Sequence, residues 1–218
     1  RNGTPLPGET GATFTTNTLV NHDEITVTMT STATCPNPAT VTSEKLTITV
    51  NPNLEPSVTI LESANPVCQG SQVTFTATPV NGGSTPSYQW KVNGINTGTN
   101  SPIFTYTPNN GDQVSVTMTT SATCRTKDDD DSNIISMVVN PVVTPSVSVS
   151  ASDNNFCPGT TVTFTATPTH GGPTPTYQWK INGTPVGSNS NTFVSSTLNN
   201  GDIVSVTLTS NAPCVTTP

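Results

Sequence analysis

The chain has 218 residues and a net charge of −7, with only 6 Lys and Arg residues against 13 acidic ones. Because the chain has so few basic residues, it offers no positive surface for nucleic acid or for an anionic membrane. Neither is expected as a partner. Hydrophobic residues make up a low 31% of the chain, but about a fifth of all residues are Thr, which favours strands over disorder.

The sequence repeats itself with a period of about 89 residues. The run CQGSQVTFTATPVNGGSTPSYQWKVNG (68–94) returns as CPGTTVTFTATPTHGGPTPTYQWKING (157–183). The run NNGDQVSVTMTTSATC (109–124) returns as NNGDIVSVTLTSNAPC (199–214), and the related run VNHDEITVTMTSTATC occupies 20–35. Repetition at one period indicates an array of similar modules.

This repeat divides the chain into three parts. We expect residues 53–141 to form one complete module of normal domain size. Residues 1–52 are expected to be the C-terminal half of another module, and residues 142–218 a module without its last strand. Because Arg1–Gly3 matches Val92–Gly94, the chain is expected to be a segment of a longer protein.

Apolar residues that alternate with polar ones predict short strands in every part of the chain. In chain order the predicted inward-facing sets are Ile25, Val27, Met29; Leu46, Ile48, Val50; Val73, Phe75, Ala77; Tyr88, Trp90, Val92; Val114, Val116, Met118; Ile135, Met137, Val139; Val162, Phe164, Ala166; Tyr177, Trp179, Ile181; and Val204, Val206, Leu208. Asn-Gly and Gly-Gly steps, and the recurrent Asp23, Asp112 and Asp202, predict turns between strands. No window has helical spacing.

The predicted fold class is therefore all-β, with tandem immunoglobulin-like β-sandwich modules in an extended array. Trp90 and Trp179 are predicted core residues, because each shares a face with the apolar residues of its strand. The links 50–56 and 139–145 each contain two prolines, which predicts short, stiff and extended connections between modules.

The repeated strings resemble a known class of module. The pattern C-x-G-x-x-V-T-F-T-A-T-P, followed by T-P-x-Y-Q-W-K-x-N-G and N-N-G-D-x-V-S-V-T, is similar to the immunoglobulin-like and PKD-like repeats of very large bacterial surface proteins. Proteins of that kind are exported by the type IX secretion pathway and include gliding-motility adhesins. The resemblance covers essentially the whole chain and implies a cell-surface or extracellular location, adhesion or spacing, and no chemistry of its own.

We expect a structural and adhesive repeat segment of a large secreted cell-surface protein or extracellular filament. Such a segment provides reach and repeated contacts without catalysis. The alternative is a spacer or carbohydrate-binding accessory region of a secreted polysaccharide-degrading enzyme. Neighbouring repeats of the same chain are the expected partners, and surface polysaccharide or other copies of the chain are candidates. Insertion into a membrane is not expected.

Cysteines recur twice per module, as Cys68 with Cys124 and Cys157 with Cys214. None lies in a C-x-x-C pair or beside a His, so we expect disulfides and an oxidising compartment rather than zinc. Pairing within each module is one alternative. However, Cys68 precedes its strand and Cys124 follows its own, which predicts a separation of about 20 Å, beyond the ~7 Å Cα limit for a bridge. Pairing of Cys68 with Cys214 between modules is an equal alternative, and Cys35 is expected to have lost its partner to truncation.

The chain has no recurrent group with the arrangement of a catalytic site. His22 and His170 take turn positions that Gly111 and Asn81 hold in other modules. No Ser lies in a G-x-S-x-G elbow, and the acidic residues form no recurrent pair. We therefore expect no catalytic residue, no enzyme activity and no cofactor.

One acidic run interrupts the repeat in a single module. It consists of Asp128, Asp129, Asp130 and Asp131. Consecutive carboxylates make the run a calcium candidate, although it lacks the spacing of an EF-hand loop. The alternative is a solvated acidic loop that Arg125 and Lys127 partly neutralise.

Overall fold

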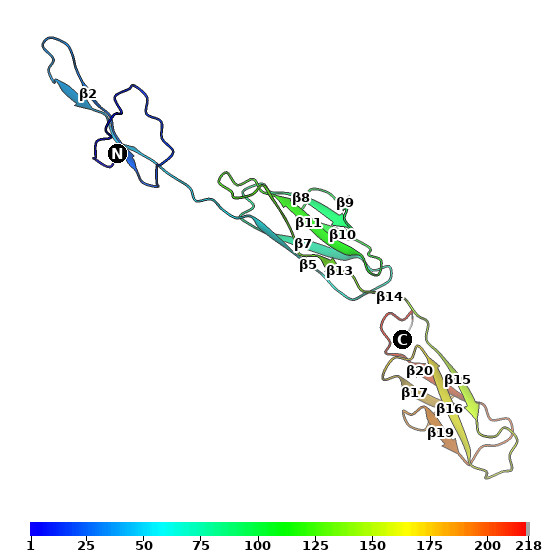
Figure 1. Ribbon diagram of the computed structural model, residues 1–218. Helices are drawn as coiled ribbons and strands as arrows, with labels where there is room; N and C mark the ends of the chain where they lie inside the picture. The colour runs from blue at the N-terminus through cyan, green and yellow to red at the C-terminus, as the bar shows by residue number, and fades with distance from the viewer. Residues whose placement is uncertain (217–218) are drawn as a thin grey trace.

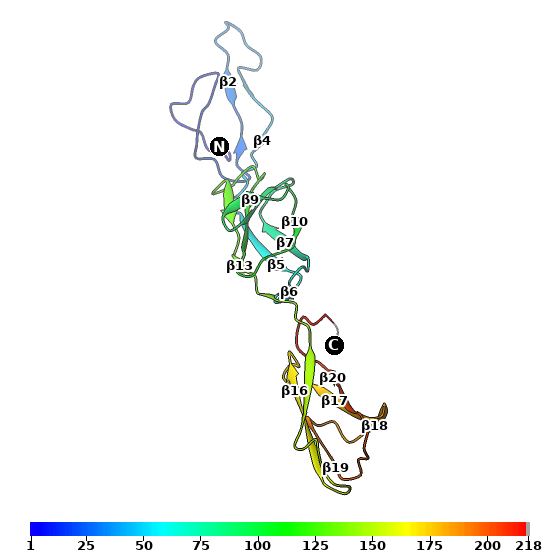
Figure 2. The ribbon, with the colours of Figure 1, turned by 90° about the vertical axis from the view of Figure 1, so that its right-hand side faces the viewer.

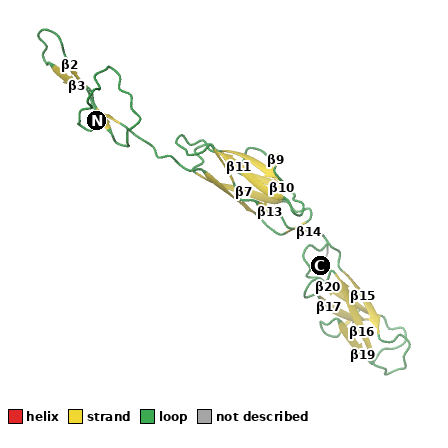
Figure 3. Cartoon of the chain, in the orientation of Figure 1, coloured by secondary structure: helices red, strands yellow, loops and turns green. Residues whose placement is uncertain are grey.

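The computed structural model describes residues 1–216. In this part of the chain, strands form several mostly antiparallel sheets and no helix occurs (Figure 1, Figure 3). The predicted all-β class is therefore confirmed. The strands fall into three groups in chain order, which we call the N-terminal segment (1–52), the central unit (53–141) and the C-terminal unit (142–216). Residues 217 and 218 of the predicted third module lie outside the described residues.

Two sheets enclose the core of the central unit. Its strands are β5 (Ser57–Glu62), β6 (Val67–Cys68), β7 (Val73–Val80), β8 (Ser87–Val92), β9 (Ile95–Thr97), β10 (Ile103–Tyr106), β11 (Gln113–Thr119), β12 (Asp129–Asp131), β13 (Ile135–Ser136) and β14 (Val139–Asn140). One sheet has the order β10-β7-β5. The other has the order β12-β11-β8-β9, and β13 also pairs with β11. The buried apolar side chains of both sheets form one cluster between them.

Alternation along β7 explains why this segment is a strand with one buried face. Val73, Phe75 and Ala77 are buried, whereas the Thr residues between them are partly or fully exposed. Because β-branched Thr favours extended backbone, the outer face supports the same conformation as the inner one.

Trp90 lies fully buried in the core of the central unit. Its ring stacks on Phe104 with 5.5 Å between the ring centroids. Its indole N–H donates to the carbonyl oxygen of Ser101 at 2.8 Å, so burial leaves this donor paired. Trp179 is equally buried in the C-terminal unit and donates to the carbonyl oxygen of Ser190 at 2.8 Å.

The C-terminal unit repeats the two three-stranded arrangements of the central unit. Its strands are β15 (Ser146–Ala151), β16 (Val162–Thr169), β17 (Thr176–Ile181), β18 (Thr184–Val186), β19 (Thr192–Ser195) and β20 (Val204–Thr209). The sheet orders are β15-β16-β19 and β18-β17-β20, which correspond to β5-β7-β10 and β9-β8-β11. Val204 and Val206 are only half-buried, whereas Val114 and Val116 at the same repeat positions are fully buried. Among the described residues, no strand takes the place of β13 beside β20.

The N-terminal segment has no second sheet among the described residues. Its strands form two separate pairs, β1 (Glu24–Ile25) with β4 (Leu46–Thr47) and β2 (Thr28–Thr30) with β3 (Thr40–Thr42). Val27 and Met29 are 63% and 60% exposed, so the prediction that they face a core is wrong in this segment. The alternation is present, but burial also requires a second sheet against which the apolar face packs.

We expect Met118→Ala to lower the free energy of unfolding of the central unit by about 2–5 kcal/mol, because it removes a fully buried side chain and leaves a cavity. The matched change at the same repeat position, Met29→Ala, removes an exposed side chain and should cost less than about 0.5 kcal/mol. Hydrogen exchange of the amides of β11 and β2 in a series of urea concentrations measures the change in the free energy of unfolding for each variant. Equal losses in the two variants would contradict this difference in burial.

Candidate functional site

A disulfide joins the central unit to the C-terminal unit. Cys68 and Cys214 are bonded, with their Cα atoms 5.3 Å apart and a sequence separation of 146 residues. Of the two pairings that the sequence left open, the structure therefore has the one between modules. The surrounding backbone explains how two residues so distant in sequence come together.

Cys68 is held against the link that leaves the central unit. Its strand β6 pairs in parallel with β14, with Val67 opposite Val139 and Cys68 opposite Asn140. The N–H of Val67 donates to the carbonyl oxygen of Val138 at 3.0 Å, and the N–H that follows Cys68 donates to Asn140 at 2.8 Å. These bonds fix Cys68 at the end of the unit where the chain passes to the next one.

Cys214 is held against the same link from the other side. The N–H of Val143 donates to the carbonyl oxygen of Cys214 at 2.9 Å, and the N–H of Thr216 donates to Val143 at 3.0 Å. Both views of the ribbon place the end of the described chain beside the link (Figure 1, Figure 2). The link 139–145 is thus hydrogen-bonded to both units, which favours the stiffness that its prolines predict.

In residues 1–216 no disulfide forms within a module. Cys68 lies beside β14, near the start of β11, whereas Cys124 follows the end of β11 and accepts a hydrogen bond from the N–H of Leu54 at 3.0 Å. The seven residues of β11 alone span about 20 Å, too far for a bond between Cys68 and Cys124. Cys124 and Cys157, both predicted disulfide cysteines, are free thiols in this structure, and so is Cys35.

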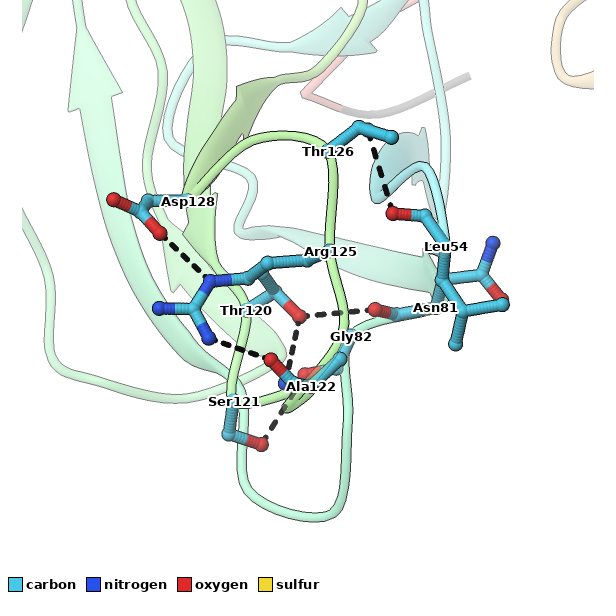
Figure 4. Close-up of polar contacts among 9 residues, drawn as sticks. All are labelled: Leu54, Asn81, Gly82, Thr120, Ser121, Ala122, Arg125, Thr126 and Asp128. Atoms are coloured by element: carbon cyan, nitrogen blue, oxygen red, sulfur yellow. Dashed lines mark hydrogen bonds and ion pairs between the residues drawn. The ribbon is translucent and has the colours of Figure 1, made fainter. Parts of the chain in front are cut away.

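The loop that carries Cys124 is fixed by several polar contacts (Figure 4). Thr120 Oγ1 donates to the carbonyl oxygen of Asn81 at 2.9 Å. Arg125 closes the loop, because its Nη1 donates to Ala122 at 2.6 Å and its Nε to Asp128 at 2.7 Å. The loop is therefore held in place although its cysteine is unbonded.

An Asn and an Asp recur together at the same turn in all three parts of the chain. In the central unit Asn93 Nδ2 donates to Asp112 Oδ1 at 2.9 Å, and the N–H of Gln113 donates back to Asn93 Oδ1 at 2.9 Å. The N–H of Asn109 donates to the other carboxylate oxygen at 2.8 Å. The corresponding Asn–Asp pairs, each at 2.7 Å, are Asn2–Asp23 and Asn182–Asp202.

In the central unit this Asn–Asp hydrogen bond connects the turn between β8 and β9 to the start of β11. Asn93 and Asn182 adopt φ of 54° and 50°, a left-handed conformation that Asn tolerates well. The sequence identified the Asp residues as turn residues but missed their Asn partners. The signal that could have found them is the Asn-Gly step that returns 19 to 21 residues before each Asp.

The acidic run does not gather its carboxylates at one point. Side chains alternate along β12, and the run is already paired with nearby groups. Lys127 bonds Asp130, and the hydroxyl of Thr117 donates to Asp131. In residues 1–216 no group of three His, Cys, Asp or Glu side chains is placed to hold a metal ion. Calcium binding at Asp128–Asp131 stays a prediction.

Both histidines lie in turns, as the repeat predicts. His22 and His170 have φ of 69° and 53°. His170 Nδ1 lies 3.2 Å from the carbonyl oxygen of Thr144, the contact that Asn81 makes with Glu55 at 2.8 Å in the central unit. His170 thus fills the structural place of an Asn.

No known protein-family profile matches the chain, and no curated protein matches it either. No helix in residues 1–216 has the length and apolarity needed to cross a membrane. Function is therefore inferred from the sequence repeat and from the joint, which consists of the link 139–145 and the Cys68–Cys214 bond.

Arg1 holds the pKa of Asp23 well below its usual range. The guanidinium lies 2.6 Å from Asp23 Oδ2, and the carboxylate also accepts the N–H of Val20, which together lower the pKa to about 2. Hydrogen bonds from Asn199 and Asn182 lower the pKa of Asp202 as well. Because these folded pKa values are depressed, the stabilisation by each carboxylate is present above the unfolded pKa of about 4 and is lost as the pH falls through the folded value.

We expect Arg1→Ala to raise the pKa of Asp23 from about 2 toward 3.8, because the largest stabilising contact of its carboxylate is removed. The pKa of Asp202 should not change, which makes it an internal control. Titration of the carboxyl carbons by NMR measures both groups in one sample. If Asp23 titrates at the same pH in the variant as in the original chain, the ion pair with Arg1 does not hold it.

Proposed function

We propose that this chain is a structural and adhesive repeat segment of a large secreted cell-surface protein or extracellular filament. Its parts are the C-terminal half of an immunoglobulin-like module (1–52), a complete module (53–141) and a module without its last strand (142–218). They provide reach and transmit tension, with no catalysis of their own. The observation that carries this proposal is the disulfide between Cys68 and Cys214, which connects two units and does not lie within one of them.

The position of this bond suits a chain that is pulled along its length. A pull on the two ends passes from residue 68 directly to residue 214 through the sulfur atoms. The 146-residue stretch that the bond closes contains most of both units, so the pull cannot extend that stretch while the bond is intact. A bond within one unit would leave the other unit free to unfold and extend under the same pull.

Secretion is supported by the same bond, because disulfides persist in oxidising compartments outside the cytosol. The export route and the adhesin type rest on the resemblance of the repeated strings to surface-protein repeats. Neighbouring repeats are the proposed first partners. Surface polysaccharide is the proposed adhesion target, and the exposed Thr hydroxyls on the outer sheet faces, such as those of Thr74 and Thr105 at 3.0 Å from each other, are the groups that would bind sugar hydroxyls.

We expect the oxidised chain, pulled between its ends, to extend far less on unfolding than the reduced chain. The difference should be about 500 Å, since each of the 146 residues closed by the disulfide adds about 3.4 Å when stretched. Single-molecule force spectroscopy with and without reductant measures this contour length directly.

Two cysteine variants serve as matched controls. Cys68→Ser should release the full length without reductant, whereas Cys157→Ser, which changes a free thiol in the equivalent loop, should behave as the original chain. Full extension of the oxidised original chain would contradict a disulfide that carries the force between the units.

A further inference from the structure

The N-terminal segment exposes an apolar face that is buried at the same repeat positions of the central unit. Val27, Met29 and Leu46 are 63%, 60% and 62% exposed. Their counterparts Val116, Met118 and Ile135 are at most 8% exposed. The sequence therefore places core residues on a surface where nothing covers them among the described residues.

The central unit shows what covers such a face. Strand β8 lies beside β11, with Trp90 opposite Val116 and Tyr88 opposite Met118. The opposing sheet adds Ile60 from β5 and Phe75 from β7 to the same core cluster. All of these groups belong to residues 53–91, the first half of the repeat.

The N-terminal segment also has a free strand edge for β8 to occupy. In the central unit β11 has neighbours on both sides, β8 on one and β12 with β13 on the other. In residues 1–52, β1 pairs only with β4 and β2 only with β3, which correspond to the second side. The edge that corresponds to the β8 side has no strand partner in the described part of the chain.

A second and independent observation comes from Cys124. The link residue Leu54 donates to the carbonyl oxygen of Cys124 at 3.0 Å, just as Val143 donates to that of the bonded Cys214 at 2.9 Å. The loop of Cys124 is therefore positioned as in the joint that has a disulfide. What the joint at Cys124 lacks is the counterpart of Cys68.

A cavity marks the place of that missing group. It measures about 380 Å³ and is lined by Cys124, by Asn51, Pro52 and Leu54 of the link, and by the loops at Gly83 and Ser121. Asn51 corresponds to Asn140, against which Cys68 is paired in the other joint. A loop of the form Cys-Xaa-Gly beside Asn51 would reach Cys124 through this space.

We propose that the N-terminal segment and Cys124 together bind one polypeptide segment with the sequence pattern of residues 53–91. The apolar strands of that segment cover Val27, Met29 and Leu46, and its Cys-Xaa-Gly loop forms a disulfide with Cys124. Each joint between successive modules is then closed by a disulfide of the kind that joins Cys68 to Cys214.

The bound segment fits with its last residue, the counterpart of Lys91, next to Arg1. Asn2 makes the contacts with Asp23 that Asn93 makes with Asp112, so Arg1 takes the place of Val92 at the end of β8.

Formation of the disulfide needs an oxidant, which we take to be a small-molecule disulfide such as oxidised glutathione. The thiolate of one cysteine attacks this disulfide and releases one thiol. The thiolate of the second cysteine then attacks the mixed disulfide and releases the other thiol. Two protein thiols are oxidised, one disulfide reagent is reduced to two thiols, and the two protons end on these products.

The test uses the full chain extended by a copy of residues 53–91 fused ahead of Arg1 and oxidised with glutathione disulfide. Digestion without reductant and mass spectrometry should find Cys124 bonded to the cysteine of the extension, with Cys68–Cys214 retained. Hydrogen exchange in residues 24–30 should slow at least tenfold, at a rate that does not depend on protein concentration.

Two control extensions separate the parts of the proposal. An extension with its cysteine replaced by Ser should still slow exchange in residues 24–30 but leave Cys124 free. An extension with the same residues in scrambled order should do neither. The proposal is overturned if Cys124 stays free while Cys68–Cys214 forms, because that bond shows that the rest of the chain folds and oxidises normally. Unchanged exchange in residues 24–30, or protection only at concentrations where the chain dimerises, would also overturn it.

Discussion

The disulfide between Cys68 and Cys214 adds a second covalent connection between two folded units that are already joined through the link 139–145. Closing a stretch of 146 residues lowers the entropy of the unfolded chain by an amount worth about 5 kcal/mol at room temperature. More importantly for an extended protein, the bond fixes how one unit follows the next. The units themselves have small cores, and the C-terminal unit in particular has a core strand, β20, whose apolar residues are only half-buried.

The bond depends on the link between the units. Residues 139–145 are not a passive spacer, because β14 pairs with β6 on one side and Val143 pairs with Val215 on the other. Proline limits the conformations of the link, and the hydrogen bonds to both units select one of them. Backbone contacts that involve neither sulfur atom thus bring the Cα atoms of the two cysteines to 5.3 Å from each other. The same downstream contact recurs at Leu54, which shows that the second joint is built on the same plan.

Much of the fold could be predicted from alternation alone. The pattern around Phe75 and Trp90 identified strands and their buried faces, because successive side chains of any strand point to opposite faces. Burial of Val27 could not be predicted in the same way, because it depends on a second sheet that the local pattern does not supply. The cysteine pairing stayed open for a related reason: it depends on which ends of two units meet. The Asn93–Asp112 contact was missed because its two residues are 19 positions apart and neither is unusual in a turn.

The bond between Cys68 and Cys214 is tested most directly by peptide mapping of the oxidised chain. Digestion without reductant, followed by mass spectrometry, identifies each disulfide by the two peptides that it joins. We expect a single joined pair that contains Cys68 and Cys214, with Cys35, Cys124 and Cys157 recovered as free thiols. Recovery of Cys68 joined to Cys124, or of Cys157 joined to Cys214, would contradict the joint described above and the function proposed from it.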